Sequence, residues 1–164
     1  MQRFKKIKLT QGKYALVDAE DFEWLSQWKW SFDIRKGDKT GYAFRNTRMD
    51  EGTRRRLRMH NEILGSSGID HVNGNGLDNR KQNLRPATGH QQAYNKGVHS
   101  HKKSKGCKGV SIVKDRNGIP AYWIARITVK GERKYLGTFR NHIAASRAYI
   151  KAAKEFHGEF ARWK

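Results

Sequence analysis

Residues 69–96, IDHVNGNGLDNRKQNLRPATGHQQAYNK, carry most of the chemistry of this chain and predict its local fold. They begin with a carboxylate beside an imidazole, Asp70 and His71, and continue through a loop rich in Asn and Gly, residues that favour tight turns. A short return strand follows. Thr88 and Gln91 then have the spacing of a capping box, which predicts the start of a helix. We therefore expect two strands and a helix around a small polar centre.

The side chains expected at this polar centre suit a hard divalent cation. Mg²⁺ binds carboxylate and amide oxygens and keeps several waters, which leaves room for a phosphate. A neutral histidine within hydrogen-bond distance of a water can accept its proton. Because neighbouring residues of a strand point to opposite faces, we expect one of Asp70 and His71 to be a metal ligand and the other the base. An ordinary polar turn is the alternative, and the ordered set of features disfavours it.

The stretch DHVNGNGLDNRKQNLRPAT resembles the core of the HNH endonucleases, or ββα-metal (His-Me finger) nucleases, in the homing-endonuclease branch of phages and mobile elements. The resemblance implies that His71 is the general base, that Asp70 binds Mg²⁺ or Mn²⁺, and that Asn83 braces the loop. It also implies a second ligand from the helix, which is usually Asn. The matching residue here is Gln92, whose amide oxygen lies one methylene further out. Asn95, one turn further along, is the alternative ligand.

Composition points independently to a nucleic-acid partner. The 164 residues include 35 Lys and Arg against 15 Asp and Glu, which gives a formal net charge of +20. A charge of this size predicts binding to a polyphosphate such as double-stranded DNA. No long apolar run indicates a membrane span, and the first residues show no signal peptide. The single cysteine, Cys107, excludes a disulfide within the chain and fits a reducing cytoplasm. The sequence leaves open whether the protein is a monomer or a dimer.

The first 66 residues read as strands with one short helix. Trp28 and Trp30 lie at strand spacing, and we expect both to be core residues rather than stacking partners for bases. Basic residues in the N-terminal part are predicted phosphate contacts, although a charged edge strand is the alternative for the Arg54 run and an ion pair within the fold for Arg85. The predicted contacts are Arg54, Arg55, Arg56, Arg80, Lys81 and Arg85.

A basic stretch at residues 98–106 has almost no apolar residue and no periodicity. These properties predict a linker. The sequence therefore predicts an endonuclease domain at residues 1–97 and a second domain at residues 107–164. The linker charges, Lys102 and Lys103, are expected to lie along the DNA backbone.

The last part of the chain predicts three strands, at residues 110–114, 122–129 and 134–138, followed by a helix that Asn141 caps and Gly158 ends. The helix carries small and aromatic residues at helical spacing, which predicts that it packs closely on one face of the sheet. This stripe comprises Ala145, Ala148, Tyr149, Ala152 and Phe156. The other face of the sheet is left free, with polar residues that include Lys114.

Five blocks of this region, KGV, YWIARI, KYLGTF, AASRAYIKAA and HGEFA, resemble in order the ethylene-response-factor (APETALA-type) DNA-binding domain. The resemblance implies an antiparallel three-stranded sheet on one helix, with the sheet in the DNA major groove. Such a sheet reads base edges and fixes its register on phosphates. The arginine-rich first strand of the plant proteins is replaced here by GVSIV, so plant target sequences are not expected. The matching positions are Lys108, Ser111, Arg126, Thr128, Arg133 and Tyr135.

Together these features predict an α+β protein with a β-rich N-terminal module that contains an HNH finger, a linker, and a three-stranded sheet packed on one helix. The predicted function is a site-specific DNA endonuclease of the homing type, with a one-metal mechanism and an infected or bacterial host cytoplasm as its location. The alternative is a sequence-specific DNA-binding regulator whose HNH core is inactive, which the glutamine at position 92 keeps open. An RNA-binding protein attracted by charge alone is a third possibility.

Overall fold

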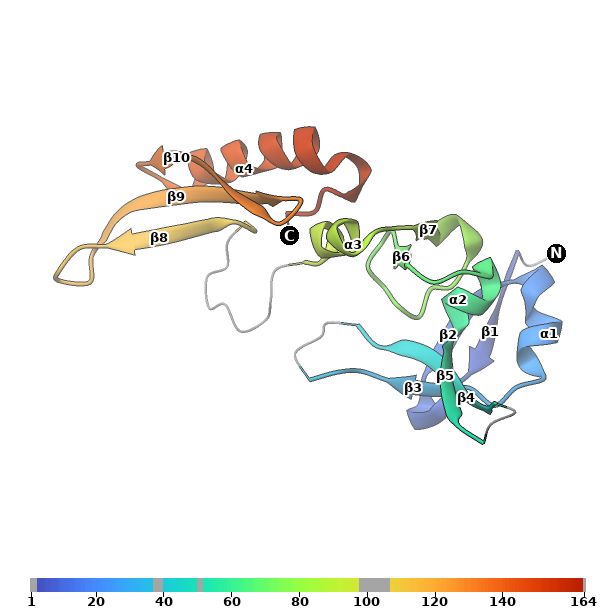
Figure 1. Ribbon diagram of the computed structural model, residues 1–164. Helices are drawn as coiled ribbons and strands as arrows, with labels where there is room; N and C mark the ends of the chain where they lie inside the picture. The colour runs from blue at the N-terminus through green and yellow to red at the C-terminus, as the bar shows by residue number, and fades with distance from the viewer. Residues whose placement is uncertain (1–2, 37–39, 50–51, 98–106, 164) are drawn as a thin grey trace. The chain divides into compact units, whose positions relative to one another are not determined.

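The computed structural model describes residues 3–36, 40–49, 52–97 and 107–163 (Figure 1). The predicted linker at residues 98–106, with Lys102 and Lys103, lies outside this range. The described chain is a mixed α+β protein with small antiparallel sheets, as predicted. Its contacts divide it into two compact units, Met1–Ala87 and Thr88–Lys164, which we call the N-terminal unit and the C-terminal unit.

Within its described residues, the N-terminal unit has three antiparallel sheets, in which short strands pair with close neighbours in the sequence. The pairs β1–β2 and β6–β7 form two-stranded sheets, and the third sheet has the order β3-β4-β5. The strands are β1 (Phe4–Lys8), β2 (Tyr14–Asp18), β3 (Ser31–Asp33), β4 (Tyr42–Arg48), β5 (Arg54–Arg58), β6 (Ile69–His71) and β7 (Leu84–Pro86). The helices are α1 (Phe22–Ser26) and α2 (Met59–Leu64), with 3-10 turns η1 (Thr10–Gly12), η2 (Ala19–Asp21) and η3 (Lys81–Asn83).

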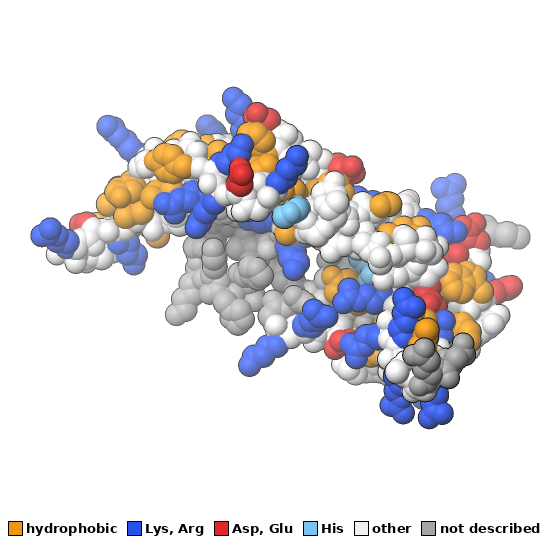
Figure 2. Space-filling view, in the orientation of Figure 1, with side chains coloured by type: hydrophobic (Ala, Val, Ile, Leu, Met, Phe, Trp, Pro, Cys, Tyr) orange, Lys and Arg blue, Asp and Glu red, His pale blue; other side chains and the backbone are white. Residues whose placement is uncertain are grey.

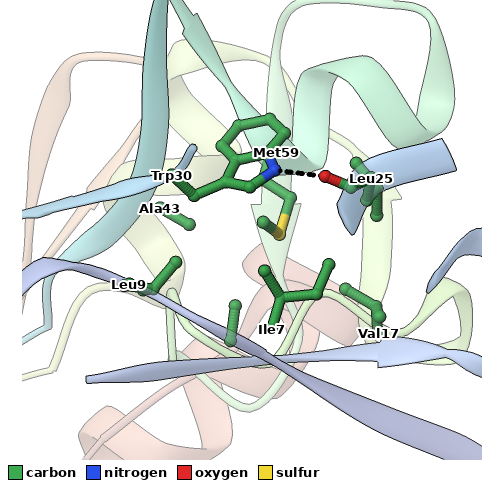
Figure 3. Packing of buried hydrophobic residues seen from close by; sticks show 8 residues of the cluster. Ile7, Leu9, Val17, Leu25, Trp30, Ala43 and Met59 are labelled. Atoms are coloured by element: carbon green, nitrogen blue, oxygen red, sulfur yellow. Dashed lines mark hydrogen bonds between the residues drawn. The ribbon is translucent and has the colours of Figure 1, made fainter. Parts of the chain in front are cut away.

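The core of this unit packs β1 and β2 against α1, α2 and Trp30 (Figure 3). Trp30 is fully buried, and its indole Nε1 donates a hydrogen bond of 2.8 Å to the Leu25 carbonyl. Trp28 is 48% exposed, so the prediction that it belongs to the core is wrong. Trp28 lies at the bend after α1, before the strand begins, and the two-residue period therefore does not apply to it. The Arg45 guanidinium lies over its ring instead, 4.1 Å from the centroid.

The C-terminal unit contains one three-stranded antiparallel sheet, with the order β10-β9-β8, and a long helix along one of its faces (Figure 1). Asn141 Oδ1 accepts the Ala144 amide at 2.8 Å and so caps this helix as expected. The elements of this unit are α3 (Gly89–Asn95), β8 (Val110–Lys114), β9 (Pro120–Val129), β10 (Glu132–Phe139), α4 (His142–His157) and η4 (Gly158–Phe160).

Helix α4 packs on the sheet through small residues and Tyr149, which contact the buried Ile127 of β9. The predicted stripe is only partly right, because Phe156 is 40% exposed. Tyr149, Ala153 and His157 are each four residues apart, form one row on the helix, and are all buried. Phe156 lies one residue off this row, and the Lys134 ammonium covers its ring at 5.0 Å.

Candidate active site

The loop between β6 and β7 is held by the side-chain amide of Asn83. Asn83 Oδ1 accepts the Asn73 amide at 2.9 Å, and its Nδ2 donates to the Asp78 carbonyl at 2.7 Å. The Asn83 carbonyl also accepts the Val72 amide at 2.9 Å. One side chain therefore ties both limbs of the loop to the start of β7, which is the geometry that the predicted bracing role requires.

His71 is buried at the end of β6, and its Nε2 lies 3.2 Å from Asn79 Oδ1. With the amide oxygen as acceptor, the neutral ring carries its proton on Nε2 and a lone pair on Nδ1. Burial lowers the pKa of His71 below its usual value, although the hydrogen bond to Asn79 and the charges of Asp70 and Asp78 partly oppose the shift. The ring is therefore neutral near neutral pH, as a general base must be.

Two aromatic side chains pack against His71. The His60 ring meets it edge to face, 4.9 Å between centroids, and the Tyr42 ring lies at 5.8 Å. His60 is itself buried, and burial with the neighbouring His71 lowers its pKa to about 3. His71 thus lies between rings on one side and loop amides on the other. The sequence analysis missed Asn79 and Tyr42, since only the tertiary contacts associate them with the imidazole.

Asp70 is paired across the ladder with Arg85. Its Oδ2 accepts hydrogen bonds from Arg85 Nε at 3.2 Å and Nη2 at 3.0 Å, and both side chains are largely buried. The ion pair named as an alternative role for Arg85 is therefore present. The carboxylate is a hard oxygen donor, which fits Mg²⁺ or Mn²⁺ in kind. Within the described residues, no cluster of three or more His, Cys, Asp or Glu gathers to hold a metal.

The two other basic residues predicted near the finger also have carboxylate partners. Arg80 binds Asp78 through two hydrogen bonds of 2.7 Å, and this guanidinium holds the pKa of the Asp78 carboxyl below its usual value. Lys81 forms ion pairs with Glu20 and Asp21. The Lys81 ion pairs join the loop to η2, and phosphate contact by either residue stays a prediction.

The residues predicted as helical metal ligands lie on α3. The capping box is present, since Thr88 Oγ1 accepts the Gln91 amide and Gln91 Oε1 accepts the Thr88 amide. Gln92 is half-buried and Asn95 is buried. Both belong to the C-terminal unit, whereas Asp70 and His71 belong to the N-terminal unit. The choice between the two helical ligands therefore stays a prediction, as does the complete ββα-metal finger.

The arginines of β5 lie at the edge of the β3-β4-β5 sheet. Arg54, Arg55 and Arg56 are all exposed, and Arg56 also forms an ion pair with Asp33 at 2.7 Å and lies over the Phe44 ring. Lys and Arg side chains prevail over acidic ones on the face shown in Figure 2. The exposed arginines of β5 are thus accessible to a phosphate backbone.

Strand register places most of the residues predicted to contact DNA in the C-terminal unit on the sheet face opposite α4. Ala125 and Ile127 are buried toward the helix, so the alternate residues of β9 point away from it. Arg133 pairs with Thr128, Tyr135 with Arg126, and Ser111 with Ile124. The open face therefore presents Ser111, Arg126, Thr128, Arg133 and Tyr135.

Two further lysines are predicted as DNA contacts. Lys114 ends β8 at an irregularity opposite Pro120 and is exposed. Lys108 precedes β8, and its ammonium binds main-chain carbonyls of α3 and the residue after it. Its surroundings are described further below.

A curated protein of Acanthamoeba polyphaga mimivirus, named an uncharacterized HNH endonuclease, is 27% identical to this chain over 160 residues, which cover 92% of this chain and 74% of the relative. This similarity supports the HNH nuclease family for the chain. Neither a protein-family profile nor a solved structure matches it. No helix in the described part of the chain is long and apolar enough to cross a membrane.

Proposed function

We propose that this protein is a DNA endonuclease that hydrolyses phosphodiester bonds by an HNH mechanism with one divalent cation, Mg²⁺ or Mn²⁺. The observation that carries the proposal is a buried histidine next to an aspartate, at the start of a loop braced by an asparagine amide. The name of the mimiviral relative and the charge of +20 point the same way. Double-stranded DNA is the proposed substrate, in the cytoplasm of a host cell.

In this mechanism His71 Nδ1 accepts a proton from a water molecule, whose oxygen then attacks phosphorus while the bond to the leaving oxygen breaks. Asp70 and Gln92, with Asn95 as the alternative, are the residues that would hold the cation. When bound, the cation supplies positive charge to the phosphate and its leaving oxygen. The Asn79 oxygen keeps the imidazole proton on Nε2, and Asn83 keeps the loop in place.

The C-terminal sheet is proposed to hold the duplex. Its open face carries Arg126 and Arg133, whose guanidinium groups can bind base edges in a major groove. Thr128, Ser111 and Tyr135 on the same face can bind phosphates or further edges. The proposed fold relationship is to the ethylene-response-factor type of domain, and the target sequence is expected to differ from those of plants.

The proposed activity is tested by cleavage of supercoiled plasmid with Mg²⁺, compared between the wild-type protein and His71→Ala. Loss of the general base should lower the rate by a factor of about 10² to 10⁴. DNA binding, measured by fluorescence anisotropy in EDTA, should stay unchanged and serves as the folding control. If the wild type cleaves no faster than His71→Ala while both bind duplex DNA, the protein is the DNA-binding regulator instead. Equal competition by single-stranded RNA would favour an RNA-binding protein.

The helical ligand is tested by substitution on α3. Gln92→Asn should keep or raise cleavage, because it preserves an amide oxygen at the position where the family usually has Asn, whereas Gln92→Ala should lower it strongly. The measurement is the cleavage rate as a function of Mn²⁺ concentration. If Asn95→Ala abolishes cleavage and Gln92→Ala does not, Asn95 is the ligand.

A further inference from the structure

Helix α3 is built into the C-terminal unit through Tyr94. The Tyr94 ring is buried and stacks on the His157 imidazole, with 3.8 Å between centroids and 6° between planes. Its hydroxyl accepts a hydrogen bond from the Lys130 amide in the β9–β10 turn. His157 Nε2 in turn donates to the Thr128 carbonyl at 2.9 Å. One side chain of α3 therefore contacts both the end of α4 and the turn of the sheet.

Lys108 binds main-chain carbonyls at the same, C-terminal end of the helix. Its Nζ lies 3.0, 2.9 and 3.0 Å from the carbonyl oxygens of Ala93, Tyr94 and Lys96. The last carbonyls of a helix lack partners within it, and a cation there is favourable. An ammonium has three donors, and these carbonyls accept all of them. Burial, with repulsion from Arg162 and Lys96, lowers the pKa of Lys108 to about 8. The side chain is thus an internal connection.

We propose that four residues make α3 a fixed part of the C-terminal unit: Tyr94, Lys108, Lys130 and His157, which we call the α3 clamp. In this clamp Lys108 is a positioning residue for α3 rather than a phosphate contact. The hydrogen bonds and the ring stack that form the clamp all lie within the C-terminal unit. Its importance for cleavage rests on the proposed function, because α3 carries the candidate cation ligand. The unit that holds the duplex would then also set the position of that ligand.

The clamp is tested in the full chain with Lys108→Met, which removes the donors but keeps an unbranched stem. Arg133→Met is the matched control, since Arg133 is exposed on the open sheet face. Hydrogen exchange of the α3 amides should be at least about tenfold faster in Lys108→Met and unchanged in Arg133→Met. The slope of log affinity for duplex DNA against log salt, measured in EDTA, should be unchanged in Lys108→Met, whereas the loss of a phosphate contact would lower it by about 0.9.

Cleavage provides the link to function. In Lys108→Met the single-turnover rate at saturating DNA should fall while the DNA affinity stays constant, and Lys108→Arg should restore part of the rate, because a guanidinium can also donate to carbonyls. A salt slope that falls by about 0.9 with unchanged α3 exchange would make Lys108 a phosphate contact and overturn the proposal. Unchanged exchange and unchanged slope would overturn it as well. If the exchange and slope results hold but the wild type does not cleave DNA, the proposed function fails and the clamp stands.

Discussion

At the scale of single residues, the contact between His60 and His71 couples the protonation states of the two imidazoles. Both are buried, and their rings meet at 4.9 Å between centroids. A proton on either ring would be poorly solvated and would repel a proton on the other. The pair therefore favours the neutral state of both rings, which is the state that the proposed base requires.

This contact predicts that acid destabilises the fold. The pKa of His60 is about 3 in the folded protein and 6.5 for an unperturbed histidine, so between these values the unfolded chain binds more protons. The free energy of unfolding should therefore fall, by about 1.4 kcal/mol per pH unit from this residue, as the pH decreases below 6.5. The lowered pKa of His71 acts in the same direction.

Urea unfolding at about pH 7 and about pH 4 measures this effect. His60→Gln should make the free energy of unfolding less dependent on pH, because the side chain no longer titrates. His90→Gln is the control, since His90 is exposed on α3. An equal pH dependence in the wild type and His60→Gln would contradict the prediction.

At the scale of elements, the entry to β8 depends on a glycine. Gly109 has φ +74°, and a Cβ there would overlap the Tyr149 ring of α4 and the Arg126 carbonyl of β9. The Gly109 carbonyl also accepts the Arg126 amide at 2.9 Å. The close approach of this turn to the sheet and the helix is thus possible only without a side chain.

Gly109→Ala should lower the free energy of unfolding by about 3 kcal/mol or more, because a left-handed backbone strain and an overlap in the core add. Gly118→Ala is the matched control. Gly118 has a similar φ, +78°, but no atom lies within 4 Å of an added Cβ, so only the strain of about 1 to 2 kcal/mol remains. Urea unfolding measures both, and equal losses would contradict the packing argument.

At the scale of the whole molecule, the excess of Lys and Arg gives both units a basic surface, shown in part in Figure 2. Not every basic residue is available to a phosphate. Arg80 and Arg85 are paired with carboxylates, and Lys108 with carbonyls. Among the described residues predicted to bind DNA, the accessible cationic regions include Arg54, Arg55, Arg56, Lys114 and the open face of the C-terminal sheet.

We expect the affinity for duplex DNA to depend steeply on salt. Six to ten phosphate contacts would lower the affinity by a factor of about 10³ to 10⁵ between about 50 mM and about 200 mM salt, because bound counterions are released on binding. Anisotropy titrations in EDTA measure the slope. The double variant Arg54→Met/Arg55→Met should lower the magnitude of this slope by about 2. Arg85→Met is the control, since Arg85 is paired with Asp70, and it should leave the slope unchanged. A shallow slope in the wild type would contradict binding through the backbone.

The sequence by itself determined the features that depend on neighbouring residues. The capping box at Thr88 and Gln91, the helix start at Asn141, and the sheet face shared by Arg126 and Thr128 follow from hydrogen bonds and periods that span a few residues. The motif around Asp70 could be recognised for the same reason, because it consists of residues in a set order along a short stretch of the chain. Local rules are sufficient where the partner of a group lies within a turn or a strand pair.

Only the tertiary structure decided which groups are buried and which charges are paired. Trp28 is exposed, whereas Trp30 belongs to the core. Lys108 and Arg133 are both basic residues that the sequence predicts as DNA contacts, but Lys108 binds carbonyls of α3. Asn79 was found as the partner of the imidazole in the same way. The physical reason is that burial and ion pairing depend on the segments that pack against a side chain, and those segments are brought together by folding rather than by their order in the chain.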